Sequence, residues 1–396
     1  MTKPRVAIVA ASLDILGGQG VQAASLVESL DADGYAVTFV PINPVFPRGL
    51  RWARKIPGLR TMVNQNIYVP SLIRLDAVDV VHVFSASYWS FLLAPVPAML
   101  IGRVLNKRVV LHYHSGEADD HLARWGRLVH PFMRLADVIA VPSEYLRRVF
   151  AAHGYTAEVV PNVVDLTRFR YRERQPLGPR VLSTRNLEAY YRIDLAIDAF
   201  ARFRAVEPAA TLTIAGYGSE EPRLRRLAAD IGGNAVQFVG KVDPGAMPKL
   251  LDDHDIFVNA STLDNQPVSI LEACAAGIPI VSSSAGDIPA MVRDGETALL
   301  APTGDATALG DGIVAVWRDP DAARARARLA HVEVANYSWP AVRARWDEIY
   351  RLERQERQDG QEGISLPAYP AHPAIPALTT EEKRADQNVI IAAESR

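Results

Sequence analysis

Short β-rich runs alternate with helical patterns through the first half of the chain. Each run is apolar and long enough for one buried strand, and each is followed by a stretch with helical spacing of its apolar residues. This alternation is typical of a parallel sheet, because parallel strands need a connection long enough to hold a helix. The predicted strands are Arg5–Ala10, Ala36–Val40, Val78–Phe84, Arg108–His114, Asp137–Ser143 and Ala157–Pro161.

A second series with the same alternation follows in the other half of the chain. Between its first two strands, the apolar residues of Asp194–Val206 recur at helical spacing, and Asp194 is placed to cap that helix. The repetition predicts an α/β protein with two Rossmann-like domains. The second set of predicted strands is Arg180–Thr184, Thr211–Gly216, Val236–Gly240, Asp255–Ser261, Ile278–Ser284 and Thr297–Ala301.

A break in the pattern separates the two series. Residues 166–179 are mostly polar and contain Pro176 and Gly178, which is typical of an interdomain linker. The sequence therefore predicts an N-terminal domain at 1–165 and a C-terminal domain at 180–337.

The end of the chain divides into two parts. Residues 338–353 carry Trp339, Trp346 and Ile349 at helical spacing, which predicts one more packed helix. Residues 354–396 are rich in Gln, Glu, Ala and Pro without periodicity, and we expect this tail to be disordered.

The composition is that of an ordinary globular protein. Of 396 residues, 49% are hydrophobic and 22% charged, and the net charge of −2 gives no reason to expect a nucleic-acid partner. Cys274 has no second cysteine to pair with, and the longest apolar run, Phe91–Ile101, is shorter than the roughly 20 residues that span a bilayer. The N-terminal run lacks the pattern of a signal peptide. These features predict a cytoplasmic protein.

Two helix starts are candidate anion sites. After the first predicted strand, Gly17 and Gly18 precede a helix, so backbone N–H groups could approach phosphate oxygens, although a plain connecting turn is an equal alternative. Residues 264–269 enter a second helix that ends before Gly277. Unpaired N–H groups at its start suit a diphosphate. Within it, Glu272 is expected to face ligand hydroxyls, the alternative being a solvent-facing glutamate.

Two polar residues end predicted strands. Arg185 follows Arg180–Thr184 at the edge where doubly wound sheets bind ligands, and arginine there suits bidentate phosphate contact. His114 lies at the corresponding edge of the first sheet and could hold a sugar hydroxyl. The alternatives are a solvated arginine and a structural histidine.

Two other segments are interpreted as structural. Asp253 and Asp255 have the spacing of a metal-binding Asp-x-Asp motif, but they lie between a helix and a strand. The basic segment 46–62 is interpreted as a solvated loop because prolines interrupt it, with peripheral contact to an anionic membrane as the alternative.

Taken together, the chain resembles the retaining glycosyltransferases of family 4, which have the GT-B fold of two facing Rossmann-like domains. The resemblance rests on the order and spacing of several motifs over most of the chain. They are the glycine turn at Gly17 and Gly18, Val160–Asp165, Ile214–Gly218, Val236–Gly240, Asp264–Gly277, Ile278–Val281 and Gly286–Pro289.

The resemblance implies a role for each candidate residue. Arg185 would bind the donor diphosphate, Glu272 the ribose hydroxyls, and backbone groups near Val239 and Lys241 the base. Asp264 would lie near the donor sugar with the amides of Gln266, Val268 and Ser269. The glycine turn would close over the phosphates, His114 would contact the transferred sugar, and the last helix would cross back to the first domain.

The resemblance also implies a reaction that retains the anomeric configuration through an oxocarbenium-like transition state, without metal or other cofactor. Two departures from the family pattern stand out. Tyr191 occupies the place of a phosphate-binding lysine, for which Arg192 could supply the charge, and Asp264 stands where glutamate is commoner.

The function expected is therefore transfer of a sugar from a nucleotide diphosphate, UDP rather than GDP because UDP is common among relatives, to a glycan or lipid-linked acceptor. Polysaccharide or glycolipid biosynthesis is the expected setting. The alternatives are a non-catalytic sugar-nucleotide binder and a sugar-nucleotide epimerase or phosphorylase on the same fold.

Overall fold

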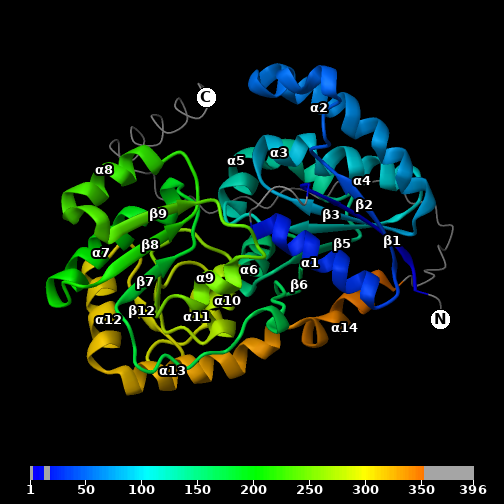
Figure 1. Ribbon diagram of the computed structural model, residues 1–396. Helices are drawn as coiled ribbons and strands as arrows, with labels where there is room; N and C mark the ends of the chain where they lie inside the picture. The colour runs from blue at the N-terminus through cyan, green and yellow to red at the C-terminus, as the bar shows by residue number, and fades with distance from the viewer. Residues whose placement is uncertain (1–2, 13–17, 352–396) are drawn as a thin grey trace. The chain divides into compact units, whose positions relative to one another are not determined.

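The computed structural model describes residues 3–12 and 18–351. Within them the strands form two sheets of six parallel strands each (Figure 1), and all twelve predicted strands are found within a few residues of their expected bounds. The strands are β1 (Arg5–Ala10), β2 (Ala36–Pro41), β3 (Val80–Ser85), β4 (Arg108–Tyr113), β5 (Val138–Val141), β6 (Glu158–Val159), β7 (Arg180–Ser183), β8 (Thr211–Ala215), β9 (Val236–Gly240), β10 (Ile256–Asn259), β11 (Ile280–Ser283) and β12 (Leu299–Ala301).

Helices alternate with these strands, as a parallel sheet requires. The α-helices are α1 (Gly18–Ala32), α2 (Pro57–Ser71), α3 (Tyr88–Leu93), α4 (Pro95–Val104), α5 (Ala118–Met133), α6 (Glu144–Ala152), α7 (Ile193–Val206), α8 (Glu221–Gly232), α9 (Met247–Asp252), α10 (Val268–Ala276), α11 (Ile288–Met291), α12 (Ala306–Arg318), α13 (Pro320–Glu333) and α14 (Trp339–Tyr350). The 3-10 helices are η1 (Arg48–Lys55), η2 (Leu72–Ala77), η3 (Leu166–Arg168), η4 (Ala189–Tyr191), η5 (Gly233–Ala235) and η6 (Val334–Tyr337).

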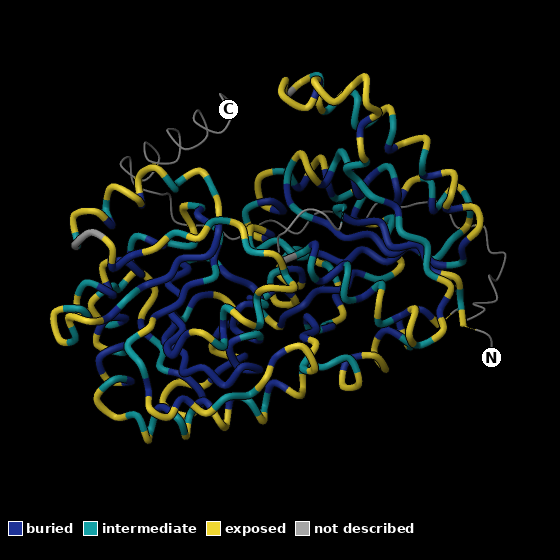
Figure 2. The backbone as a smooth tube through the Cα atoms, in the orientation of Figure 1, coloured by how far each residue is buried: buried dark blue, intermediate teal, exposed yellow. Residues whose placement is uncertain are grey.

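The first sheet has the strand order β2-β1-β3-β4-β5-β6 and is covered on both faces. Alternate residues of β1 face opposite sides: Ile8 packs with α1 and α14, whereas Val9 packs with α4 and α5. Both faces are apolar because helices cover both, which is why these strands appear as continuous hydrophobic runs in the sequence. Figure 2 shows buried backbone through the middle of this sheet, where β1, β3 and β4 lie.

The second sheet has the order β12-β11-β10-β7-β8-β9. Its two apolar layers again lie on opposite faces, with Val181 of β7 packing against α7 and α12 and Leu182 packing against α10 and α13. Helix α7 begins at Ile193 with Arg192 in the N-cap position, so the prediction that Asp194 caps it is wrong. Asp194 lies in the first turn instead, where its carboxylate is paired with Arg192.

Helix α14 returns to the first sheet, as predicted. Its apolar residues share a core cluster with Ile8 and with α1, and Trp346 and Tyr350 are almost fully buried there. Arg108 Nε on β4 donates to the carbonyl oxygen of Ile349 at 2.8 Å. The tail predicted at 354–396 lies outside the described residues, and the domain boundaries stay predictions.

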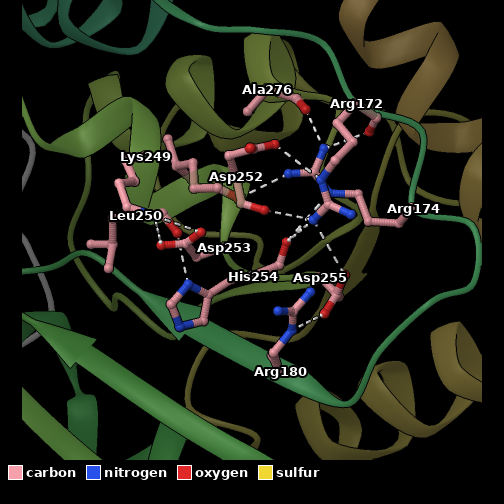
Figure 3. A network of polar contacts seen from close by, with 11 residues as sticks. Arg172, Arg174, Arg180, Lys249, Leu250, Asp252, Asp253, His254, Asp255 and Ala276 are labelled. Atoms are coloured by element: carbon pink, nitrogen blue, oxygen red, sulfur yellow. Dashed lines mark hydrogen bonds and ion pairs between the residues drawn. The ribbon is translucent and has the colours of Figure 1, made fainter.

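Arginines tie the segment 166–179 to the second domain (Figure 3). Arg174 is 1% exposed and donates to four carbonyl oxygens, which include those of Leu251 at 2.9 Å and of Ala276 at the end of α10. Its positive charge therefore lies at the negative end of that helix dipole. Asp255 accepts from Arg180 at 2.6 Å and from Arg172 at 3.4 Å, which agrees with the structural interpretation of the Asp-x-Asp segment.

Residues 45–64 belong to a different compact unit from the two sheets. They are not the loop predicted from the prolines: η1 follows Pro47, and α2 begins at Pro57, where a missing N–H costs nothing. The Arg54 guanidinium lies 5.1 Å from the Phe46 ring centroid. Leu50, Trp52 and Ile56 are exposed. In the described part of the chain, every helix is too short or too polar to cross a membrane.

Both strand orders contain a switch point, where successive connections leave in opposite directions. It lies between β1 and β3 in the first sheet and between β7 and β10 in the second. Ligands of doubly wound sheets bind outside the carboxyl ends of the strands at such points. A site is therefore expected near the carboxyl ends of β1 and β3 in the first sheet and of β7 and β10 in the second.

Candidate active site

One cavity of about 640 Å³ lies at these strand ends. Its walls come from residues after β3 and β4 in the first domain and after β7, β8, β9 and β10 in the second, together with the start of α10. Eight of the sequence-predicted site residues line it: His114, Arg185, Lys241, Asp264, Gln266, Val268, Ser269 and Glu272.

The other predicted site residues lie elsewhere. Gly17 is outside the described residues, and Gly18 is the first residue of α1, whose Gln19 lines the cavity. Val239 lies on β9 with 46% of its surface exposed. Arg192 has a left-handed backbone, φ +46°, and its Nε donates to Asp194 at 3.0 Å. Ligand contacts by these residues stay predictions.

Arg185 is buried directly after β7 and is therefore not a solvated surface arginine. Its Nη2 donates to Asp264 at 2.6 Å, its Nη1 donates to Ser269 Oγ at 3.1 Å, and its guanidinium carbon lies 4.1 Å from the Tyr191 ring centroid. Among the described residues, its Nε has no partner. Burial opposes the charge, but Asp264, Tyr191 and Tyr190 outweigh it and raise the pKa of Arg185.

Asp264 is held beside Arg185 by the backbone of a neighbouring loop. Gly286 has φ +55°, and a Cβ at that position would lie 1.6 Å from the carbonyl oxygen of Asp264. Only glycine permits this approach. Burial raises the pKa of Asp264, while Arg185, Ser261 and the amide of Asn265 work against that rise. The close packing fixes the carboxylate that faces the cavity.

Gly216 has a comparable role at the end of β8. A Cβ there would lie 2.2 Å from the carbonyl oxygen of Arg185. The absence of a side chain at Gly216 thus allows the Arg185 backbone to approach, and both residues line the cavity.

Helix α10 presents its N-terminus to the cavity. Pro267 occupies the N-cap position and Gly277 has the left-handed conformation, φ +66°, that ends many helices. Glu272 lines the cavity one turn beyond Val268 and is half-buried there. Burial raises the pKa of Glu272 to about 7, against the opposing effects of Arg168 and Arg185. Cys274, on the same helix, is a buried packing residue.

His114 follows β4 and lines the cavity from the first domain. Its ring stacks on Phe84 with centroids 5.0 Å apart, and its backbone N–H donates to the Ser85 carbonyl oxygen at 3.2 Å. Burial lowers the pKa of His114 to about 3, so the imidazole is neutral at physiological pH. In the described part of the chain its Nε2 has no hydrogen-bond partner.

Polar contacts join the two domains beside the cavity. The amide N–H of Asn162 donates to Gln266 Oε1 at 2.5 Å, and Asn162 Nδ2 donates to the Gln266 carbonyl oxygen at 2.8 Å. Ser143 Oγ donates to Asn265 Oδ1. The side-chain oxygen and the carbonyl oxygen of Gln266 are therefore engaged by the first domain, and a ligand contact by its backbone amide stays a prediction.

Sequence reasoning missed several aromatic residues of the cavity wall. Tyr88 and Trp89 follow β3, and Tyr190 follows β7. The rule that pointed to His114, a residue just beyond a predicted parallel strand, could have found Trp89 as well. Across the residues that the structure describes, no group of three or more His, Cys, Asp or Glu side chains could hold a metal ion.

The arrangement suits an anionic ligand with hydroxyl groups. Arg185 and the first N–H groups of α10 supply positive charge, as phosphate oxygens require. The neutral imidazole of His114 and the carboxyl of Glu272 supply hydrogen-bonding groups for the hydroxyls.

Family models and relatives of known function match most of the chain. The family model described as Glycosyltransferase Family 4 matches residues 16–168, and the model described as Glycosyl transferases group 1 matches residues 178–319. A glycogen synthase of Mycobacterium tuberculosis is 30% identical over 303 residues, which are 70% of this chain and 70% of that protein. A GDP-mannose-dependent alpha-(1-6)-phosphatidylinositol monomannoside mannosyltransferase of Mycolicibacterium smegmatis is 30% identical over 296 residues, 66% of this chain and 76% of that protein.

Among solved structures, HepE of Anabaena superposes with a TM-score of 0.69 at 17% identity, covering 87% of this chain and 98% of that one. This similarity confirms the fold of two Rossmann-like domains. The matched family models and the relatives confirm the rest of the interpretation: the chain is a glycosyltransferase and belongs to glycosyltransferase family 4.

Proposed function

We propose that this chain transfers a sugar from a nucleoside diphosphate sugar to a glycan or lipid-linked acceptor with retention of the anomeric configuration. The observation that carries the proposal is Arg185: a buried arginine with an unpaired Nε lies beside the N-terminus of α10 in the cavity at both switch points. Such a cation in a partly dry site is a strong partner for a diphosphate.

In this proposal the diphosphate lies between Arg185 and the first N–H groups of α10, and Glu272 accepts from the ribose hydroxyls. Backbone groups near Val239 and Lys241 contact the base. Asp264 and the amides of Val268 and Ser269 contact the donor sugar together with His114, which accepts or donates one hydrogen bond as a neutral imidazole.

The reaction breaks the bond between the anomeric carbon and the diphosphate oxygen. The acceptor oxygen bonds to the same carbon on the face that the diphosphate leaves, and the acceptor proton passes to a leaving phosphate oxygen. Negative charge grows on that phosphate, where Arg185 and the α10 amides stabilise it. These groups supply the positive charge that a divalent cation gives in other transferases, so the proposed reaction needs no metal.

The relatives differ in the nucleotide that carries the donor sugar. HepE of Anabaena was crystallised with UDP-glucose, whereas several mannosyltransferase relatives are named as dependent on GDP-mannose. We keep UDP as the proposed nucleotide, on the frequency of UDP donors in the family, and GDP as the competing one.

Peripheral binding to an anionic membrane through residues 46–62 is part of the proposal for a lipid-linked acceptor. The unit has exposed apolar side chains at Leu50, Trp52 and Ile56 next to a basic run. Cosedimentation with vesicles containing anionic lipid, before and after neutralising Arg51, Arg54 and Lys55, measures this contact. Binding that is unaffected by the substitutions would contradict it.

The main test is thermal stabilisation of the purified protein by UDP, GDP, ADP and CMP, because a ligand of the native state raises the melting temperature. We expect one nucleotide diphosphate to stabilise selectively and Arg185→Ala to abolish the shift. Nucleotide release in the presence of sugar donors, with and without EDTA, then tests turnover and metal independence. Binding without turnover over a broad acceptor panel would favour the non-catalytic alternative instead.

A further inference from the structure

A large aromatic side chain is exposed in the wall of the cavity. Trp89 lines the same cavity as His114 and Glu117, and 65% of its surface is accessible. Tryptophan carries the largest apolar surface of any residue. A ligand that covered the exposed indole would bury this surface, and that burial would stabilise the complex. The donor-binding groups described above do not include Trp89, since they come from the second domain and from His114.

Trp89 is held in place by packing that favours one orientation. The edge of Trp125 meets it at a centroid distance of 5.2 Å and an interplanar angle of 88°. Tyr88, the residue before it, has φ +56°, a left-handed conformation that costs roughly 1–2 kcal/mol in a residue other than glycine. The Tyr88 hydroxyl donates to Asp120 of α5, which anchors this strained turn. Backbone strain of this kind often accompanies a functional site.

A carboxylate lies in the same wall. Glu117 lines the cavity at the start of α5, and in the described residues its carboxylate has no hydrogen bond or ion pair. Tyr190, which follows β7 in the second domain, also lines the cavity with 41% of its surface exposed.

An exposed indole face and a carboxylate that line one cavity fit one ligand chemistry. A pyranose ring has a face of C–H groups that packs on an aromatic ring, and hydroxyls at its rim that donate to carboxylate oxygens. A flexible acyl chain would use the indole but not the carboxylate, and a small acyclic alcohol would use the carboxylate but not the indole face.

We propose that Trp89 and Glu117 form the acceptor subsite and that the acceptor presents a pyranose ring there, stacked on Trp89 with its hydroxyls donating to Glu117. This inference rests on the proposed transferase function and adds the acceptor class. The donor sugar is held by the second domain, so the acceptor ring on Trp89 approaches it from the first domain next to His114.

The test uses the full chain saturated with the nucleotide diphosphate that stabilises it. Methyl α-glucoside, methyl α-mannoside, maltotriose and glycerol are titrated while tryptophan fluorescence is recorded. We expect a saturable change with at least one pyranoside and none with glycerol. The chain has six tryptophans, so the same titration on Trp89→Phe assigns the signal. Trp52→Ala is the matched control, an exposed tryptophan outside the cavity, and should keep the response.

Kinetics separate acceptor binding from a general defect. We expect Trp89→Ala to raise the acceptor KM at least tenfold and Glu117→Gln at least threefold, with nucleotide affinity unchanged within twofold. Trp89→Phe should recover part of the loss, because a smaller aromatic face remains. Unchanged acceptor KM in Trp89→Ala, or a fluorescence response that survives in Trp89→Phe, would overturn the inference. Failure of every nucleotide to bind would instead overturn the proposed function.

Discussion

Arg185 and Asp264 form a buried ion pair, with Arg185 Nη2 2.6 Å from Asp264 Oδ2. The two residues follow β7 and β10, which are neighbours at the switch point of the second sheet. In the protein without ligand, Asp264 compensates the buried guanidinium. A diphosphate would bring a second set of anionic oxygens to the same cation, which lines the cavity.

We expect Arg185→Ala to weaken nucleotide diphosphate binding by about 30-fold or more, because truncating one partner of a buried charge pair costs roughly 2–5 kcal/mol. Isothermal titration measures the affinity. Arg202→Ala is the control: Arg202 pairs with Asp311 on an exposed surface, and its loss should leave the affinity unchanged. Equal affinities in the two variants would show that Arg185 does not contact the diphosphate.

Gly286 should tolerate no side chain. We expect Gly286→Ala to lower the free energy of unfolding by more than about 2 kcal/mol and to weaken nucleotide binding, because the new Cβ would displace Asp264. Gly295→Ala is a matched control with φ +73° and nothing within 4 Å of the added Cβ, so only the backbone strain of about 1–2 kcal/mol applies. Urea unfolding measures the free energy of unfolding of both variants. If both lose a similar amount, the backbone near Asp264 accommodates the added Cβ without a further loss of stability.

Most of the fold could be predicted because its signal is local. Buried parallel strands are short continuous apolar runs, and the twelve strands were located from these runs alone. Errors arose where the same residue type can either interrupt a helix or begin one. The prolines at 47 and 57 were interpreted as interruptions, although a proline also begins helices, as Pro57 does for α2.

The site was predictable only in part. Arg185 and His114 were found because topology alone brings strand ends to one edge. That Arg192 could supply the charge of the missing lysine stays a prediction; the sequence pattern did not reveal that its guanidinium pairs with Asp194, two residues on. Side-chain pairing of this kind depends on rotamers and backbone conformation that composition does not reveal. Trp89 was missed because an aromatic residue after a strand is more often part of the core than of a ligand site.

Arg174 is expected to be a major structural residue of the segment 166–179. Its replacement in Arg174→Met would remove the guanidinium donors from four carbonyl oxygens and leave that of Arg172 without a donor among the described residues, and we expect a loss of about 3–5 kcal/mol in unfolding free energy. Arg170→Met, at an exposed position of the same segment, should change it by less than about 0.5 kcal/mol. Urea denaturation at neutral pH checks both; a loss below 1 kcal/mol in Arg174→Met would show that water replaces the guanidinium.

Glu272 should make the stability of the ligand-free protein depend on pH. Its pKa is about 7 in the folded protein against an ordinary 4.5, so protonation favours the folded state. The stabilisation is complete below pH 4.5 and is lost as the pH rises through 7. We expect a decline of about 1–3 kcal/mol over this range relative to Glu272→Gln, since water in the cavity screens part of the effect.

Nucleotide binding provides the second half of this test. Ribose hydroxyls that donate to the Glu272 carboxylate would favour its charged form and lower its pKa, so binding near pH 7 should release part of a proton. Titration calorimetry in two buffers with different ionisation enthalpies measures that proton, and Glu272→Gln should abolish its release. If proton release persists in Glu272→Gln, another group titrates on binding and Glu272 does not face the ribose.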